Sequence, residues 1–238
     1  METTWNNGVS ERAANLFAEQ RQARWARVDR MFAALMLVQW VCAIFVAIYF
    51  SPYGWAGKEK AIHLHVWIAT LMGGAITLLP VLLAKFKPGA LMTRHVIAIS
   101  QMLMSALLIH LSGGRIETHF HVFGSLAFLA FYLDWPVLVT ATIVVAADHF
   151  LRGLLWPESV YGITNPEWWR FLEHAFWVVF EDIILIWSCI NGMRELRAST
   201  LQQATLEHVS EQEQMKTAAL EMALAEFESQ SVPGGVRA

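Results

Sequence analysis

Histidine is the residue type in this 238-residue sequence with the clearest chemical meaning, because imidazole is the commonest side-chain ligand of transition metals. Nine histidines are present, and most of them fall on one predicted side of the apolar segments assigned below. Those on that side are His63, His65, His110, His119, His121, His149 and His174. Acidic side chains accompany them, on the same side or deeper in the apolar sequence, at Asp148, Glu173, Glu181 and Asp182. We predict that these side chains are ligands, or partners of ligands, at a metal centre.

The size of this set bears on the kind of metal centre. It exceeds the four ligands of one tetrahedral zinc ion, so it suits two metals, or one metal whose histidines are oriented by carboxylates. The ligand types favour copper or iron, with zinc as a third option. Haem b held by two opposed histidines is the alternative, and a proton-responsive network without metal also stays open. The expected core ligands are His63, His110, His119, His121, His149 and His174, with Asp148 and Glu181 as ligands or orienting partners.

The two His-x-His pairs depend on the local backbone. Residues two apart point in nearly opposite directions in a helix but to the same side in an extended chain. His119 and His121 follow Gly113-Gly114, so we expect an extended connection in which both rings can bind one ion. His63 and His65 begin an apolar segment, and there we expect only one ring to face inward.

Long apolar segments must position these side chains. Hydrophobic residues make up 56% of the chain and charged residues 16%, with mean hydropathy +0.42, whereas soluble domains have about 25% charged residues. Crossing a bilayer core takes roughly 20 apolar helical residues. The sequence therefore predicts an all-α, six-helix bundle that spans a membrane and contacts its lipids. The predicted spans are 31–50, 65–86, 95–111, 121–133, 136–156 and 171–193.

Basic residues predict the orientation of these spans. Arginines precede the first span and follow the last, and basic side chains concentrate in the connection between the second and third. The positive-inside rule then places both termini in the cytoplasm of a bacterial inner membrane. Connections 51–64, 112–120 and 157–170 face outward, and residues 132–136 form a tight hairpin between the fourth and fifth spans. A net charge of -3 gives no support for a nucleic-acid partner.

The two ends of the chain differ from the spans in composition. Residues 1–30 are polar and arginine-rich, which predicts an amphipathic cytoplasmic helix along the membrane surface. Residues 31–193 form the transmembrane domain with its outward-facing histidines. After Met193 the chain is rich in Glu, Gln and Ala as far as Gln230, with neither Gly nor Pro. Residues 194–238 therefore form a cytoplasmic linker helix with a frayed terminus, and homodimerisation stays open.

Three stretches of sequence resemble a known family. They read HLSGGRIETHFHVFGSLAFLAFYLDW from residue 110, AADHFLRGLLWPESVYG from residue 146, and WRFLEHAFWVVFED from residue 169. They are similar to the N-terminal multi-helix membrane sensor segments of bacterial signalling proteins. In that family the segment precedes PAS, histidine-kinase, diguanylate-cyclase or chemoreceptor output domains. One departure is Leu133, where the family has a basic residue.

The resemblance implies a sensory segment that acts on a cytoplasmic output domain or partner protein through residues 194–230. We therefore expect a sensor that binds a metal, or a ligand at a bound metal, and no catalytic domain in this chain. The alternative is a metal-dependent membrane oxidoreductase, with a di-metal or haem centre, acting on quinone or lipid. The charged C-terminal helix favours the sensor, because an enzyme has no need of it. A transporter is weaker, because the sequence has no internal repeat.

Overall fold

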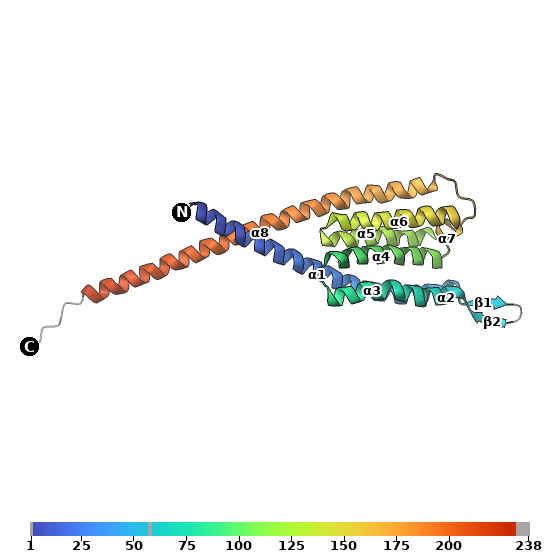
Figure 1. Cartoon of the computed structure of the whole chain (residues 1–238), viewed down its shortest axis with the longest axis horizontal. Helices are drawn as coiled ribbons and strands as arrows, with labels where there is room; N and C mark the ends of the chain where they lie inside the picture. The colour runs from blue at the N-terminus through green and yellow to red at the C-terminus, as the bar shows by residue number, and fades with distance from the viewer. Residues whose placement is uncertain (1, 57–58, 232–238) are drawn as a thin grey trace, which may run out of the picture. The chain divides into compact units, whose positions relative to one another are not determined.

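Helices form almost all of the protein, which is described by a computed structural model covering residues 2–56 and 59–231. Over these residues the fold is all-α apart from one antiparallel hairpin, β1 and β2, in which Tyr53 pairs with Ile62 (Figure 1). In chain order the elements are α1 (Glu2–Phe50), β1 (Tyr53–Ala56), β2 (Glu59–Ile62), α2 (Leu64–Trp67), the π-helical η1 (Ile68–Met72), α3 (Gly73–Phe86), α4 (Leu91–Leu111), α5 (Ile116–Leu129), the 3₁₀ turn η2 (Ala130–Tyr132), α6 (Trp135–Leu155), α7 (Glu158–Tyr161) and α8 (Arg170–Ser231).

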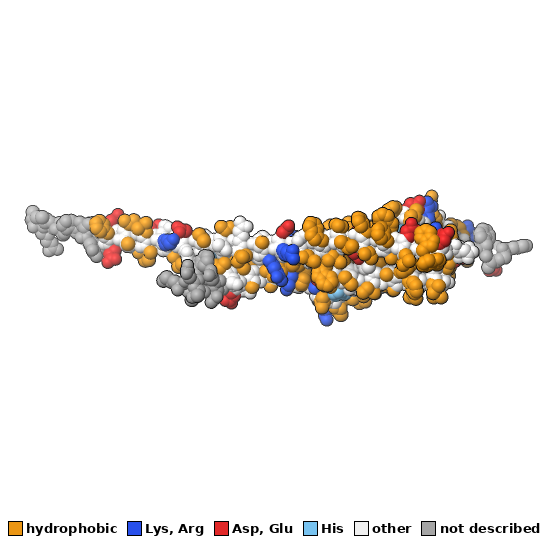
Figure 2. Space-filling model, turned by 90° about the horizontal axis from the view of Figure 1, so that it is seen from above, with side chains coloured by type: hydrophobic (Ala, Val, Ile, Leu, Met, Phe, Trp, Pro, Cys, Tyr) orange, Lys and Arg blue, Asp and Glu red, His pale blue; other side chains and the backbone are white. Residues whose placement is uncertain are grey.

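Among the residues that the structure describes, five helices are long and apolar enough to cross a membrane. They are Gly8–Phe50, Leu64–Phe86, Leu91–Leu111, Trp135–Leu155 and Arg170–Glu228. They contain the first, second, third and sixth predicted spans, and all of the fifth except its last residue. The fourth predicted span, 121–133, falls on α5 and η2, and α5 has only 14 residues. Large apolar side chains such as Phe45, Leu71 and Ile183 are exposed, and they dominate the bundle surface in Figure 2. The helices are thus compatible with a membrane protein, and the six-span count stays a prediction.

The chain divides into two units by its internal contacts. One is the bundle, residues 21–193, and the other combines residues 1–20 with residues 194–238. In the second unit a small apolar cluster joins Val9, Ala13 and Leu16 to Ala204, and Arg12 forms an ion pair of 2.8 Å with Glu207. The N-terminal segment therefore pairs with the start of the predicted linker helix.

Within the bundle, α4 is the central helix. Its apolar side chains Ile97, Met102 and Ile109 enter a core that also contains Leu126 of α5 and Leu138 of α6. A second core lies on its other side, against α1 and the start of the second span. The packing fixes α5 and α6 against α4, which matters because both helices contribute to the site below.

Two expectations about local structure can be compared directly with these helices. The tight hairpin at residues 132–136 is confirmed: Leu133 adopts a left-handed conformation (φ 54°), and α6 begins at Trp135 with Pro136 in its first turn. Helix α1 runs from Glu2 to Phe50 without a break at Arg30, and the domain boundary expected there stays a prediction. Whether residues 1–30 lie on a membrane surface stays a prediction.

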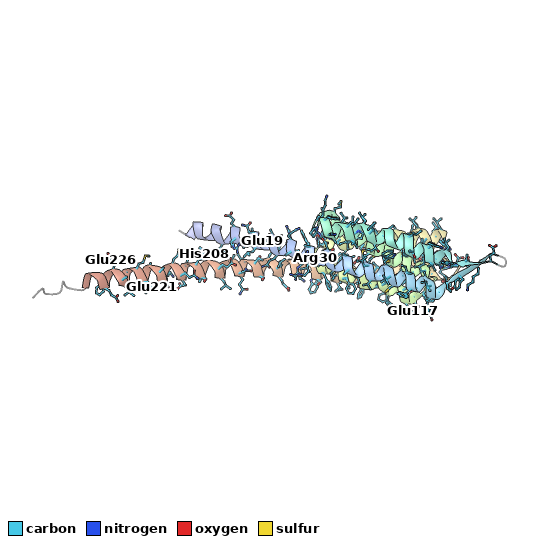
Figure 3. The ribbon with its side chains drawn as sticks, turned by 90° about the horizontal axis from the view of Figure 1, so that it is seen from below. Glu19, Arg30, Glu117, His208, Glu221 and Glu226 are labelled. Carbon is cyan, nitrogen blue, oxygen red and sulfur yellow. The ribbon has the colours of Figure 1, made fainter. Side chains whose placement is uncertain are left out.

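A buried polar clamp, which the sequence did not reveal, fastens α1 to the rest of the bundle. The carboxylate of Asp29 is fully buried and accepts hydrogen bonds from the Tyr132 hydroxyl (2.7 Å) and the Gly89 amide. Arg94 donates to the Gly89 carbonyl (2.8 Å) and to Asp134 (2.9 Å). The clamp therefore joins α1, the α3–α4 connection and the α5–α6 hairpin. It lies at the end of the bundle near Arg30, opposite the end that carries Glu117 (Figure 3).

Candidate functional site

Three of the predicted ligands meet at one point in the bundle. His119 of α5, His149 of α6 and His174 of α8 form what we call the three-histidine cluster. The ring centre of His119 lies 5.5 Å from that of His149 and 5.4 Å from that of His174, and the last two are 6.0 Å apart. Three imidazoles that bind one tetrahedral ion through Nε2 would have ring centres about 5 Å apart. The observed spacing is close to that value.

The hydrogen bonds of the three rings follow one pattern. Each Nδ1 lies close to the backbone carbonyl oxygen four residues earlier, at 3.0 Å for His119, 3.1 Å for His149 and 2.9 Å for His174. A carbonyl oxygen only accepts, so each Nδ1 carries the ring proton and each Nε2 keeps its lone pair. Metal-binding histidines use this arrangement, in which the second nitrogen donates to a carbonyl or carboxylate.

At the most buried of the three rings, that of His119, the Nε2 lone pair accepts no hydrogen bond from the described residues. His119 is 5% exposed, and its Nε2 is buried without a hydrogen-bond partner among the residues that the structure describes. A buried polar atom left unpaired costs free energy. A cation bound at this nitrogen would remove that cost.

A cavity of about 80 Å³ opens onto the three rings. Its other walls are formed by apolar side chains, including Phe123 and Val145, and by Thr142. Thr142 donates a hydrogen bond to Asp182 of α8. The cavity is large enough for an ion together with a water or another small molecule.

The predicted carboxylates take different positions. Asp182 is buried and bonded to Thr142, and its second oxygen has no partner among the described residues; the same holds for one oxygen of Glu181. Glu173 is exposed, although it is adjacent to His174 in the sequence. Asp148 lies 3.3 Å from Nδ1 of His149 and forms two hydrogen bonds of 2.7 and 2.6 Å with Arg152. Of these four carboxylates, only Asp148 has a described contact with a ring of the cluster. It contacts Nδ1 of His149 and does not line the cavity, so it can orient that ring.

A second set, His63, His65 and His110, lies apart from this cluster and is called the outer histidine group. Ring centres are 4.5 Å apart for His63 and His65 and 5.0 Å for His65 and His110, and Trp156 packs 4.9 Å from His110. Nδ1 of His63 accepts the His65 amide at 3.1 Å, which caps the start of α2. That nitrogen is therefore occupied by a structural role.

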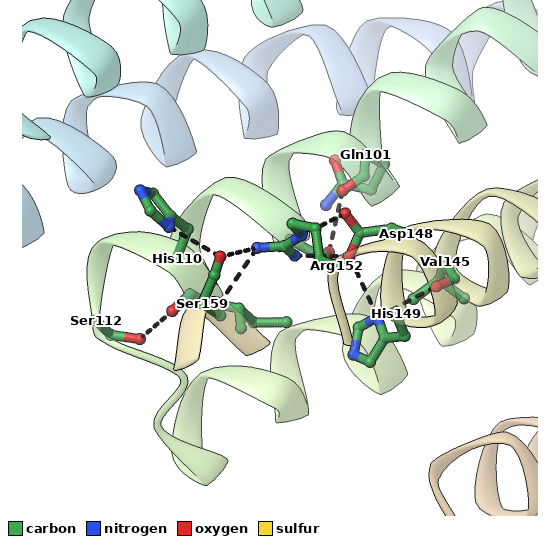
Figure 4. Close-up of polar contacts among 10 residues, drawn as sticks. Gln101, His110, Ser112, Val145, Asp148, His149, Arg152 and Ser159 are labelled. Carbon is green, nitrogen blue, oxygen red and sulfur yellow. Dashed lines mark hydrogen bonds and ion pairs between the residues drawn. The ribbon is translucent and has the colours of Figure 1, made fainter. Parts of the chain in front are cut away.

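A chain of polar contacts connects the two histidine groups (Figure 4). Nδ1 of His110 lies 2.9 Å from the Ser159 hydroxyl, which accepts a hydrogen bond of 2.8 Å from Arg152. Arg152 in turn holds Asp148, and Asp148 contacts His149. Asp148 and Arg152 form an i,i+4 pair on α6, and Ser159 reaches Arg152 from α7.

The expected extended geometry at His119 and His121 is wrong. Helix α5 begins at Ile116, so the two rings point away from each other. Nδ1 of His121 lies 2.8 Å from the Ser105 hydroxyl, and its Nε2 lies 2.9 Å from the side-chain nitrogen of Gln39. His121 is therefore a hydrogen-bonded core residue in this structure, whereas His119 belongs to the cluster.

Two further side chains, Tyr161 and Glu117, lie at the end of the bundle that carries the histidines. The Tyr161 ring packs 5.4 Å from that of His174; burial raises the pKa of its hydroxyl, which has no partner among the described residues. Glu117 is exposed, and the hydrogen bond from Arg115 lowers its pKa. Tyr161 was not among the predicted site residues, because nothing in its spacing relates it to His174.

The positions of the rings do not by themselves make a metal site. Over residues 2–56 and 59–231, no group of three or more His, Cys, Asp and Glu side chains meets the geometry of metal binding as it stands. The metal-binding role of the predicted residues therefore stays a prediction, and so do copper, iron, zinc and haem b.

Comparison with known proteins gives one informative similarity. No family model matches the chain, and no solved structure does. The chain is 31% identical over 105 residues to the transducer protein Htr8 of Halobacterium salinarum. The match covers 42% of this chain and 16% of the transducer, so the chain spans about a sixth of that protein. Part of this chain is therefore similar to part of a signal transducer.

Proposed function

We propose that the protein is the sensory part of a membrane signalling protein and that the three-histidine cluster is its metal-binding site. The observation on which this rests is the shared hydrogen-bond pattern of the three rings, which leaves an Nε2 lone pair on each of three histidines that line one cavity. Imidazole ligands favour copper or iron, with zinc as a third option. Similarity to a signal transducer supports the sensory role.

The three ligands come from three different helices, and this suggests how a signal would arise. An ion held by α5, α6 and α8 would restrain the relative positions of these helices. It would favour whichever arrangement of the three helices binds it more tightly, by as much as the two affinities differ. Helix α8 extends without a break from His174 to residues 194–230, which we propose contact an output domain or partner protein. The linker helix would transmit the change at His174.

The apolar cavity beside the rings suggests what else the site admits. No acidic or basic side chain other than the neutral imidazoles is among its lining residues, so it suits a small uncharged molecule that binds at the metal. The Thr142–Asp182 contact lies on the same side of α8 as this cavity and would respond to a shift of that helix. A ligand of the metal could thus alter α8 packing without touching the linker.

The test is metal analysis with an optical spectrum on the detergent-purified full chain and two variants. We expect a stoichiometric transition metal in the parent, its loss in His119→Ala, and its retention in His121→Ala, because only His119 belongs to the cluster. Equal loss in both variants would contradict the assignment. A Soret band would replace the metal by haem, and a parent with neither metal nor chromophore would refute the metal site.

A second experiment separates a sensor from an enzyme. Deletion of residues 200–238 should leave metal content unchanged but abolish signalling in a reporter strain that expresses the partner. Turnover of quinone by the metal-loaded protein without any partner would overturn the sensory role.

A further inference from the structure

A second pocket, of about 430 Å³, lies at the opposite end of the bundle from the outward connections. It is formed by α1, the α5–α6 hairpin and α8, all within residues 21–193. Its lining combines Arg24 and Arg27 with apolar side chains that include Met31, Phe131 and Leu185. We call it the arginine pocket.

The two guanidinium groups in this pocket have no acidic partner among the residues that the structure describes. No acidic residue lines the pocket, and neither Arg24 nor Arg27 forms a hydrogen bond or ion pair with another described residue. Nε of Arg24 is buried and has no hydrogen-bond partner in the described part of the chain. Asp29, the nearest acid in the sequence, is already bonded to Tyr132 and Gly89. Elsewhere in the bundle, by contrast, Arg94 and Arg152 each hold a carboxylate.

The chemistry of the pocket matches one kind of ligand. Guanidinium groups bind phosphate oxygens through paired, charge-assisted hydrogen bonds. The apolar part contains Met31 and Phe131, which are 36% and 50% exposed and are suited to contact acyl chains. The pocket thus offers positive charge beside an apolar surface. An anionic lipid is complementary to it, because its negative headgroup adjoins apolar acyl chains.

The place of the pocket along the chain agrees with this ligand. Arg24 and Arg27 immediately precede the apolar stretch of α1 that begins at Met31, so they lie where a membrane-spanning helix would leave the hydrocarbon. Basic side chains at the cytoplasmic boundary attract anionic lipids. Leu185 and Ser188 belong to the last apolar stretch of α8 before the linker.

We propose that the arginine pocket binds the phosphate headgroup of an anionic phospholipid, with an acyl chain along the apolar wall. The lipid would join α1 to α8 at the point where α8 leaves the bundle. This proposal needs the membrane location of the bundle but is independent of the metal site.

Native mass spectrometry and thermal unfolding of the full chain in detergent test the proposal. Phosphatidylglycerol should bind and raise the melting temperature, whereas phosphatidylcholine should do neither. In the double variant Arg24→Gln/Arg27→Gln, we expect roughly thirtyfold weaker phosphatidylglycerol binding, because the charge-assisted hydrogen bonds to the phosphate are lost. The matched control is Lys85→Gln/Lys87→Gln, which removes the same charge at the same predicted side but outside the pocket, and it should bind as the parent does.

Each other outcome would overturn the proposal. Equal weakening in the lysine control would indicate diffuse attraction rather than a site. If inorganic phosphate raised the melting temperature as much as phosphatidylglycerol does, the pocket would be a simple anion site. Because the glutamine variant could lose structure, Arg24→Lys/Arg27→Lys is a second test: it keeps the charge but not the paired donors, and we expect about threefold to tenfold weaker binding.

Discussion

The rings of His119 and His174 meet with their centres 5.4 Å apart, although one belongs to α5 and the other to the first turns of α8. His149 completes the triangle from α6. Helices α5 and α8 are separated in sequence by η2, α6, α7 and the connection between α7 and α8. The contact therefore exists only in the folded bundle, and anything bound there acts on the packing of α8.

Metal binding should stabilise the folded bundle. A ligand at 100 times its dissociation constant contributes about 2.7 kcal/mol to the free energy of unfolding. We expect Cu²⁺ to raise the melting temperature of the metal-free protein and a chelator to reverse the effect. His174→Ala should lose the response, whereas His65→Ala, in the outer histidine group, should keep it. A response lost only in His65→Ala would move the site to the outer group.

Asp148 should tune the metal site without being a ligand. It contacts Nδ1 of His149 and is held by Arg152, so its removal disturbs the orientation of that ring. Loss of such a partner typically weakens metal affinity by about 10–100-fold. We expect Asp148→Asn to fall in this range in a competition assay with a metal chelator. The control is Glu173→Gln, since this exposed side chain should leave affinity unchanged.

The polar clamp should contribute to stability and not to metal binding. Tyr132→Phe leaves one oxygen of the buried Asp29 carboxylate without its hydrogen bond, which costs about 1–3 kcal/mol. We expect a lower melting temperature with unchanged metal content. Tyr49→Phe, at an 82% exposed position, is the matched control. A variant as stable as the parent would show that the clamp is not needed for stability.

Gly114 should be needed for the start of α5. Its φ of +72° disfavours other residues, and an added Cβ would lie 2.3 Å from the Gly162 amide nitrogen. Gly114→Ala should therefore displace the end of α5 that carries His119 and reduce metal affinity as well as stability. Gly113 has a similar φ of +73°, but a Cβ added there would meet open space. The difference between Gly114→Ala and Gly113→Ala therefore measures the effect of the steric clash apart from the backbone strain. Equal metal affinity in both variants would argue against this role of Gly114.

The sequence determined the lengths of the apolar segments and the turn between the fourth and fifth of them. A hydrophobic stretch of about 20 residues reports its helical length directly, and Asp134-Trp-Pro136 starts a helix by local backbone preferences. It also indicated that most histidines belong to one end of these helices, because position along a helix follows from counting residues.

The grouping of the histidines was decided by the tertiary structure. The direction of a side chain around a helix depends on where the helix begins and how it is rotated against its neighbours, and a single sequence does not state that rotation. Because α5 begins at Ile116, the His119 ring faces α6 and α8, whereas the His121 ring faces Ser105. Ser159 and Tyr161 reach the histidines from a connection, and Asp29 reaches Tyr132 across the bundle. Such contacts join residues far apart in the chain, and the local spacing of residues does not predict them.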